Sequence, residues 1–245
     1  MTFAEIGLHE ALLKALTQAG YTDPTPVQAQ AIPAAIEGRD LLVSSQTGSG
    51  KTAAFMLPAL HRLAPQERPP FVPSPSASRR TPNQERQSAR SRGRERPRFQ
   101  PAQPKMLVLA PTRELALQVT AATDKYAGHI RHLKAVAILG GMPYPKQMEL
   151  LGRNPEILVA TPGRLIDHME SGKIDFSALQ VLVLDEADRM LDMGFIPDIE
   201  RIFQLTPFTR QTLFFSATMA PEIERITDTF LHAPERIEVA RQATT

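Results

Sequence analysis

The stretch Leu41-Leu42-Val43-Ser44-Ser45-Gln46-Thr47-Gly48-Ser49-Gly50-Lys51-Thr52 decides the fold of this chain. Its opening run is apolar without alternation, which is typical of a strand buried on both faces. The glycines that follow let backbone N–H groups turn inward and cradle phosphate oxygens, and the next helix adds the partial positive charge of its N-terminus. We therefore expect a phosphate-binding loop in which Lys51 reaches the β- and γ-phosphates and Thr52 offers a hydroxyl to Mg²⁺.

This loop departs from the strict GxxxxGK[ST] pattern at its first position, where Ser45 replaces glycine. A chance Gly-Lys-Thr in an ordinary turn is the alternative interpretation. The strand before the loop and the helix after it favour phosphate binding, because the mechanism requires both.

The rest of the chain alternates short apolar runs with amphipathic stretches. The further runs are Met106–Ala110, Ala135–Leu139, Ile157–Thr161, Val181–Leu184 and Thr212–Phe215. The helical patterns are Val27–Ile36, Thr52–Leu63, Glu114–Tyr126, Pro145–Leu151, Arg164–Ser171, Pro197–Gln204 and Glu222–Leu231. Such alternation predicts an α/β fold, with a mainly parallel sheet covered by helices on both faces. Ligands in these folds bind at the carboxyl ends of the strands, so the residues after each run are the candidates for function.

The run Val181–Leu184 is followed by Asp185-Glu186-Ala187-Asp188. An acid at a strand end that faces a phosphate loop can hold hydrated Mg²⁺, and a second acid can orient and deprotonate the attacking water. A solvated helix start is the alternative, since acids favour a first helical turn. The presence of Lys51 and Thr52 favours the catalytic interpretation.

Together these stretches resemble the N-terminal, RecA-like P-loop domain of the DEAD-box ATP-dependent RNA helicases. The matching segments are Gly20–Gln28 with Phe3 (Q motif), Ser45–Thr52 (motif I), Pro111–Ala116 (Ia), Gly140-Gly141, Thr161–Arg164 (Ib), Asp185–Asp188 (II) and Ser216–Thr218 (III). The family usually has alanine where Ser45 stands. The stretches Arg189–Ile196 and Ile237–Arg241 resemble the bacterial RhlE-type subgroup.

The resemblance implies a site for ATP and Mg²⁺. Nucleotide-binding residues would be Phe3, Tyr21, Gln28, Thr47, Gly48, Ser49, Gly50, Lys51 and Thr52. Catalysis would fall to Lys51, Thr52, Asp185 and Glu186, with Thr52 and Asp185 holding the metal. Gln28 would select adenine, because a side-chain amide offers the donor and acceptor that match adenine N7 and N6. For Gln28 a polar helix start is the alternative, and for Tyr21 and Phe3 a place in the core.

Two further sets of residues are implied by the resemblance. Asp188 would bond to Ser216 and Thr218 and so couple the nucleotide state to a second domain, although Ser216 and Thr218 could simply cap the helix that follows. Arg113, Gly141, Thr161 and Arg164 would bind RNA. Arginines, hydroxyls and N–H groups at loop–helix junctions suit phosphates and 2′-hydroxyls, so RNA binding without sequence preference is expected. Arg113 could instead be an ordinary surface arginine.

Residues 65–104 differ in composition from the rest of the chain. They hold nine arginines, three glutamates and nine of the 22 prolines, whereas the net charge of all 245 residues is only +2. Such a segment cannot bury enough apolar surface to offset the entropy of ordering it, so we expect a disordered insertion. It could tether RNA electrostatically or be a solvated insertion without a role.

The composition is otherwise that of an ordinary globular protein, with 42% hydrophobic residues. The chain has no cysteine, which excludes disulfides, thiolate zinc sites and cysteine nucleophiles. No apolar stretch approaches the roughly 18 residues of a membrane span, so we expect a cytoplasmic protein without a membrane partner. We also expect the chain to be monomeric.

We expect residues 1–245 to form one helicase N-terminal domain and the C-terminal helicase domain, with motifs IV to VI, to be absent. The predicted function is RNA-dependent ATP hydrolysis and local duplex unwinding once that domain is present, with weak activity for this chain alone. Ribosome assembly and RNA turnover are both compatible with the resemblance. A P-loop ATPase that acts on DNA and a non-catalytic nucleotide- and RNA-binding module are the alternatives.

Overall fold

A computed structural model describes residues 1–46, 48–68 and 100–239. Its centre is a parallel sheet in the order β3-β4-β2-β5-β6-β1-β7. The strands are β1 (Leu41–Ser44), β2 (Met106–Leu109), β3 (Ala135–Ile138), β4 (Ile157–Ala160), β5 (Val181–Leu184), β6 (Gln211–Ser216) and β7 (Glu235–Glu238). The RecA-like α/β class predicted from the sequence is therefore confirmed.

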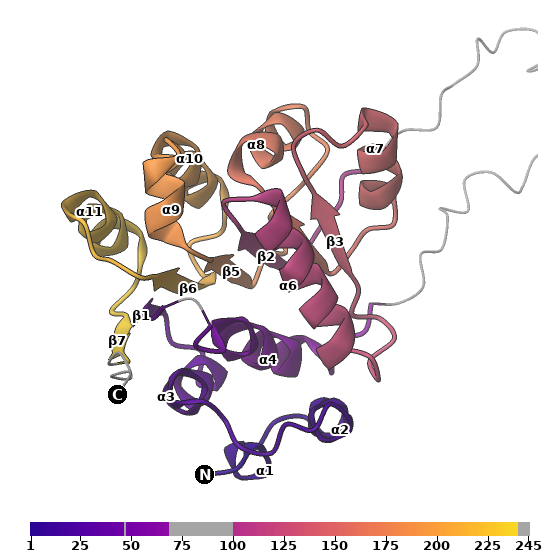
Figure 1. Cartoon of the computed structure of the whole chain (residues 1–245). Helices are drawn as coiled ribbons and strands as arrows, with labels where there is room; N and C mark the ends of the chain where they lie inside the picture. Colours follow the sequence, from indigo (N-terminus) through magenta and orange to yellow (C-terminus); the bar gives the residue numbers. More distant parts are fainter. Residues whose placement is uncertain (47, 69–99, 240–245) are drawn as a thin grey trace, which may run out of the picture.

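Helices cover both faces of the sheet, as Figure 1 shows. On one face lie α1 (Phe3–Ile6), α2 (Glu10–Gln18), α3 (Pro26–Ile36), α4 (Lys51–Leu63) and α6 (Arg113–Tyr126). On the other lie α7 (Tyr144–Gly152), α8 (Pro162–Glu170), α9 (Ala187–Asp192), α10 (Ile196–Leu205) and α11 (Pro221–Phe230). The apolar patterns had not predicted α1, α2 or α9.

The strands divide their side chains between the two faces. In β5, Val181 and Val183 join the core beneath α4 and α6, whereas Leu182 and Leu184 join the core beneath α9 and α10. All four side chains are fully buried. This explains the unalternated run, because a strand covered on both sides has no face left for polar residues.

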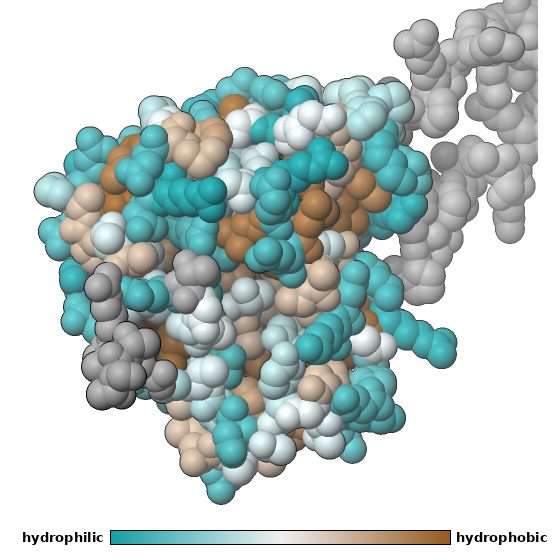
Figure 2. Space-filling model, in the orientation of Figure 1, coloured by the Kyte–Doolittle hydropathy of each residue, from teal (hydrophilic) through white to brown (hydrophobic). Residues whose placement is uncertain are grey.

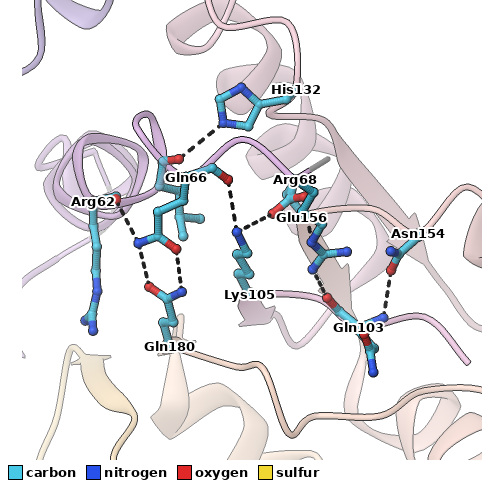
Figure 3. Close-up of polar contacts among 10 residues, drawn as sticks. Arg62, Gln66, Arg68, Gln103, Lys105, His132, Asn154, Glu156 and Gln180 are labelled. Carbon is cyan, nitrogen blue, oxygen red and sulfur yellow. Dashed lines mark hydrogen bonds and ion pairs between the residues drawn. The ribbon is translucent and has the colours of Figure 1, made fainter. Parts of the chain in front are cut away.

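The two ends of the predicted insertion are fixed at the amino-terminal edge of the sheet (Figure 3). Gln66 Nε2 donates to Gln180 Oε1 at 3.0 Å, and Gln180 Nε2 donates back to Gln66 Oε1 at 2.6 Å. Lys105 Nζ donates to the Gln66 carbonyl at 3.0 Å. These contacts join the segment after α4 to the residues that immediately precede β2 and β5.

A second group of contacts surrounds Glu156, a buried acid that directly precedes β4. Arg68 Nε lies 2.9 Å from Glu156 Oε1, and Lys105 Nζ lies 3.6 Å from Glu156 Oε2. The Gln103 N–H donates to Asn154 Oδ1 at 2.8 Å, and Arg68 also donates to the Gln103 carbonyl. Residues 65–68 and 100–104, the two ends of the predicted insertion, are therefore held by contacts with the sheet edge, and residues 69–99 lie outside the described part of the chain.

Candidate functional site

The predicted phosphate-binding loop connects β1 to α4, as expected from the sequence. Gly48 and Gly50 have φ values of +84° and +81°, a left-handed conformation that glycine adopts without strain. Gly50 is the N-cap of α4, and Lys51 and Thr52 are the first two residues of the helix. Thr47 lies outside the described residues. The backbone turn and the N-terminus of a 13-residue helix therefore converge on one point at the carboxyl edge of the sheet.

Lys51 faces the two acids that follow β5. Its Nζ lies 3.0 Å from Asp185 Oδ1 and 3.2 Å from Glu186 Oε1. The Asp185 side chain is fully buried and that of Lys51 is 10% exposed. Burial raises the pKa of Asp185 above its ordinary value, and the positive charge of Lys51 opposes this rise. The pair brings together residues that are 134 positions apart in the sequence.

Glu186 has an unusual backbone for a residue with a side chain. Its φ and ψ are both 54°, in the left-handed region, and it serves as the N-cap of α9. Such a conformation costs about 1–3 kcal/mol in a residue other than glycine, and it recurs at functional sites. Arg189, one turn along α9, lies 3.6 Å from Glu186 Oε2. The strained turn thus places one carboxylate between two cations.

A pocket of about 220 Å³ opens between the loop, α9 and the end of β6. It is lined by Ser45, Lys51, Glu186, Asp188, Arg189, Phe215, Ser216 and Ala217. Apart from Asp185 Oδ1, which contacts Lys51, several buried side-chain oxygens here have no hydrogen-bond partner among the described residues: Ser45 Oγ, Ser49 Oγ and Asp185 Oδ2. Buried polar atoms without partners are rare, and here they indicate a place built for a polar ligand.

The Q-motif segment packs directly on the loop. Gln28 Nε2 donates to the Gly50 carbonyl at 3.0 Å, and Gln28 Oε1 accepts from Thr25 N–H at 3.0 Å. The Thr25 hydroxyl donates to the Ser49 carbonyl at 2.9 Å. A Cβ on Gly50 would lie only 2.5 Å from Gln28 Nε2. Since an amide has two N–H groups and two acceptor lone pairs, Gln28 keeps one of each for another partner.

The two aromatic residues predicted near adenine behave differently. Phe3 is 4% exposed and belongs to the core, which was the alternative left open for it. Its backbone N–H donates to the Thr22 carbonyl at 3.1 Å, so it supports the Q-motif segment from beneath. Tyr21 is 45% exposed, and Lys125 Nζ lies 4.6 Å from its ring centroid and 3.1 Å from its hydroxyl.

Asp188, Ser216 and Thr218 gather at one end of this pocket. Thr218 Oγ1 donates to Asp188 Oδ2 at 3.3 Å, which agrees with the predicted pairing. The Ser216 hydroxyl instead donates to the Thr218 carbonyl at 2.7 Å. The resemblance implied a bond between Ser216 and Asp188. In the structure Ser216 instead shapes the turn after β6. Neither hydroxyl caps α11, whose N-cap is Ala220.

The predicted RNA-binding residues come from the three adjacent strands β2, β3 and β4. Arg113 is exposed at the first turn of α6, whose N-cap Thr112 accepts from Leu115 N–H at 3.3 Å. Gly141 follows β3 with a φ of +78°, and Thr161 is the N-cap of α8. Arg164 lies in the first turn of α8, 3.9 Å from Asp167. The four residues share the carboxyl edge with the loop that holds Lys51, and β5 and β6 lie between β2 and the strand that leads into that loop.

Sequence reasoning missed two residues of the site. Thr25 was quoted within the Q motif without a role, yet it forms a capping box with Gln28 and holds Ser49. The pattern Thr-x-x-Gln at a helix start was a usable signal. Arg189 was assigned only to a subgroup resemblance, and its ion pair with Glu186 depends on the left-handed turn, which no local pattern announced.

A parallel sheet whose strand runs into a phosphate-type loop, opposite an acid at another strand end, defines a P-loop nucleotide-binding domain. The family model described as DEAD/DEAH box helicase matches residues 25–226. The chain therefore belongs to the DEAD/DEAH box helicase family. Among the described residues, no helix is long and apolar enough to cross a membrane.

Several known proteins resemble the whole of this chain. The ATP-dependent RNA helicase DeaD of Klebsiella pneumoniae is 43% identical over 244 residues, covering 100% of this chain and 33% of the relative. The DEAD-box ATP-dependent RNA helicase RhpA of Helicobacter pylori is 40% identical, covering 98% of this chain and 41% of the relative. The chain thus spans about a third of the length of the DeaD relatives.

A solved structure gives the same result. The crystal structure of a hypothetical ATP-dependent RNA helicase from Sulfolobus tokodaii superposes with a TM-score of 0.75 and is 33% identical. The match covers 95% of this chain and 57% of that one. The assignment to the RhlE-type subgroup stays a prediction.

Proposed function

We propose that this chain is the ATP- and RNA-binding N-terminal half of an RNA helicase. The observation that carries the proposal is the position of Lys51 between Asp185 and Glu186, beside buried serine hydroxyls that have no hydrogen-bond partner within the described part of the chain. In this role the chain couples ATP binding and hydrolysis to RNA binding that does not depend on sequence. A cytoplasmic location and a monomeric state are parts of the proposal that rest on the sequence alone.

ATP binding would use groups from three segments. Backbone N–H groups of Gly48 to Gly50 and the Lys51 ammonium suit the phosphates. The remaining N–H and lone pair of Gln28 suit the edge of adenine, which would select ATP over GTP. Tyr21, half exposed at the outer end of the Q motif, would pack near the base.

A divalent cation fits the same place. The buried Asp185 carboxylate offers the hard oxygen ligands that Mg²⁺ prefers, and its Oδ2 has no hydrogen-bond partner among the described residues. Thr52 stands at the start of α4 beside the phosphate loop. We assign the metal to Thr52 and Asp185, with Asp185 acting through water. When bound, Mg²⁺ would supply positive charge to the phosphates.

Glu186 would orient the attacking water and accept its proton. Its carboxylate lies 3.2 Å from Lys51 Nζ and 3.6 Å from Arg189, which hold it at the pocket, where a carboxylate can accept a proton from a bound water. Asp188, Ser216 and Thr218 would transmit the nucleotide state to a second helicase domain. Their hydrogen bonds join α9 to the turn after β6, so a shift of Glu186 would reach that turn directly.

RNA would bind along β2, β3 and β4. The N-termini of α6 and α8, with Arg113, Thr161 and Arg164, suit phosphates and 2′-hydroxyls, and the open backbone at Gly141 allows close approach of a chain. These groups contact no base edges, so binding would be independent of sequence.

Unwinding would require the second helicase domain. The resemblance assigns to that domain an arginine finger, which is worth roughly 10³–10⁵ in the rate of phosphoryl transfer. We expect this chain to bind ATP and ADP, to hydrolyse ATP slowly and to leave duplexes intact. Efficient strand release by this chain alone would contradict the division of labour.

The decisive experiment is ATP hydrolysis by the chain with and without single-stranded RNA, beside binding of a fluorescent ATP analogue. Lys51→Ala is the control, and it should lose analogue binding. Binding with negligible turnover supports the proposal, whereas brisk turnover that RNA stimulates and Lys51→Ala abolishes would require another source of positive charge. Adding the second domain and comparing RNA with DNA tests the alternative of a DNA-dependent ATPase. Nucleotide and RNA binding without turnover in that protein would favour the non-catalytic module.

For the arginine-rich insertion we propose a non-specific RNA tether, on the strength of its charge. Replacing residues 69–99 with a short Gly-Ser linker leaves Arg68, Gln103 and their contacts with Glu156 and Asn154 in place. A tether requires the salt dependence of RNA affinity to weaken in this variant. An unchanged salt slope would leave a solvated insertion as the interpretation.

A further inference from the structure

Tyr144 presents an aromatic ring on the part of the carboxyl edge assigned to RNA. It is the first residue of α7, three positions after Gly141, and it is 51% exposed. Figure 2 shows apolar patches among hydrophilic side chains over α6 and β3, and β3 is the strand that precedes α7. An exposed tyrosine beside predicted phosphate contacts offers a flat apolar surface where a nucleotide chain would pass.

The ring of Tyr144 is held in place by a buried partner. It stacks on the imidazole of His168 in α8, with the ring centroids 5.9 Å apart and the planes inclined by 22°. His168 is only 1% exposed, so it forms a fixed floor beneath the tyrosine. Burial lowers the pKa of His168, which keeps the imidazole neutral.

His168 is fixed in turn by Gln147, a fully buried residue of α7. Gln147 Nε2 donates to the Met142 carbonyl, one residue after Gly141, at 2.5 Å. The side-chain oxygen of Gln147, Oε1, therefore faces His168 Nε2, also at 2.5 Å. The neutral imidazole must carry its proton on that nitrogen in order to donate to Oε1. These two bonds join α7, α8 and the turn that contains Gly141 and Met142 into one unit.

The same helix face carries a predicted phosphate contact. Arg164 precedes His168 by four residues on α8, so the two side chains are neighbours along one face. The charge of Arg164 contributes to the lowered pKa of His168, which agrees with their proximity. Arg164 therefore stands one helical turn along α8 from the residue on which the tyrosine ring stacks.

We propose that the open face of Tyr144 is a stacking platform for an RNA base, while Arg164, Thr161 and Gly141 hold the backbone of the same strand. This inference rests on the proposed function, because it needs RNA at this edge. Stacking is tolerant of sequence, since every base has a π-face. His168 and Gln147 are positioning residues that keep the platform in its orientation.

The test compares variants of this chain in binding a short single-stranded RNA at several salt concentrations. Tyr144→Ala should weaken binding by roughly 5- to 150-fold at every salt concentration, because one base loses its stacking partner. Tyr144→Phe should bind as the unaltered chain does. Arg164→Ala is the matched control: it should reduce the slope of log affinity against log salt by about one, whereas Tyr144→Ala leaves the slope unchanged.

Two further measurements separate stacking from a structural effect. An RNA that lacks its bases should bind Tyr144→Ala and the unaltered chain equally, and thermal unfolding should be unchanged by the substitution. The chain has no tryptophan, so Tyr144→Trp provides a single fluorescent reporter that a stacked base quenches. Equal affinity of Tyr144→Ala and the unaltered chain for intact RNA, or an equal loss on RNA without bases, overturns the inference alone. If the unaltered chain bound no RNA at all, the proposed function would fail with it.

Discussion

The carboxyl edge of the sheet has two halves that treat polar groups differently. Around β1, β5 and β6, charged side chains contact one another: Lys51 meets Asp185 and Glu186, and Asp185 is fully buried. Around β2, β3 and β4, the predicted RNA contacts can be reached from solvent, since Arg113 is exposed and the Arg164 side chain is 30% exposed. The buried hydrogen-bonded pair there, His168 and Gln147, is uncharged.

This difference has a physical reason. Phosphoryl transfer requires charged groups in a site that excludes water, because Coulomb interactions are large there. Burying a charge in such a site costs free energy unless an opposite charge is paired with it. Binding an RNA backbone needs cations that remain hydrated and reachable, set on a surface that is itself rigid. In the half around β1, β5 and β6, called the nucleotide half, the charged side chains therefore form buried ion pairs. In the half around β2, β3 and β4, called the RNA half, neutral hydrogen bonds hold the surface in place. Four predictions test this contrast.

The largest effect is expected for Lys51→Ala. Burial raises the pKa of Asp185, so the folded state holds the Asp185 proton more tightly than the unfolded state does. Stability therefore falls as pH rises from the ordinary range of a carboxyl group through the raised pKa. Loss of Lys51 removes the charge that opposes this rise, and it should lower the free energy of unfolding by about 3–5 kcal/mol at about pH 7.

The cost of Lys51→Ala should shrink at acid pH, where Asp185 is protonated. Denaturant unfolding at several pH values measures it. Adding Asp185→Asn to Lys51→Ala should restore most of the stability, because no unpaired buried charge is left. A cost that does not vary with pH would show that Asp185 is not the partner at issue.

The next comparison uses one glycine from each half. Gly50 and Gly141 have similar φ values, +81° and +78°, so alanine is strained at both. At Gly50 the new Cβ would meet Gln28 Nε2 at 2.5 Å, whereas at Gly141 nothing lies within 4 Å. We expect Gly50→Ala to cost about 2–4 kcal/mol and Gly141→Ala about 1–2 kcal/mol.

Thermal unfolding of the two glycine variants gives these costs. Gly50→Ala should also reduce the preference for adenine nucleotides, since it displaces Gln28, and Gly141→Ala should not. Equal costs at the two positions would contradict the close packing of the Q motif on the loop.

A smaller effect is expected for Gln147→Ala in the RNA half. The substitution leaves His168 Nε2 and the Met142 carbonyl without their 2.5 Å partners, which should cost about 1–3 kcal/mol of stability. Denaturant unfolding measures the loss. Gln66→Ala, at the amino-terminal edge and less buried, is a control that should cost less, and the reverse order would weaken the role given to Gln147.

The smallest effect is expected for Asp167→Asn. The Asp167 side chain is 69% exposed and 3.9 Å from Arg164, so loss of this ion pair should change stability by less than about 0.5 kcal/mol. RNA affinity should rise slightly, because a carboxylate that repels phosphate is removed. A fall in RNA affinity would imply that Asp167 orients Arg164.

The sequence alone determined where the chemistry begins. Strand runs such as Val181–Leu184, the glycine loop before Lys51 and the acids at Asp185 and Glu186 are local patterns, and parallel strands bring their carboxyl ends to one edge whatever their order. The α/β class and the loop could thus be anticipated, and the family resemblance implied the pairing of Asp188 with Thr218. The short helix α1 and the place of Phe3 in the core could not be decided from the sequence, because a lone buried aromatic has no distinguishing local signal.

The tertiary structure decided which groups meet. The strand order puts β5 beside β6 and β6 beside β1, so Lys51 lies against Asp185 across a long separation in the chain. The bond between Gln28 and Gly50, the stack of Tyr144 on His168 and the attachment of the insertion ends to Glu156 arise in the same way. Local propensity fixes where an element starts and ends, whereas contacts between distant residues depend on how the buried faces of all the elements pack together.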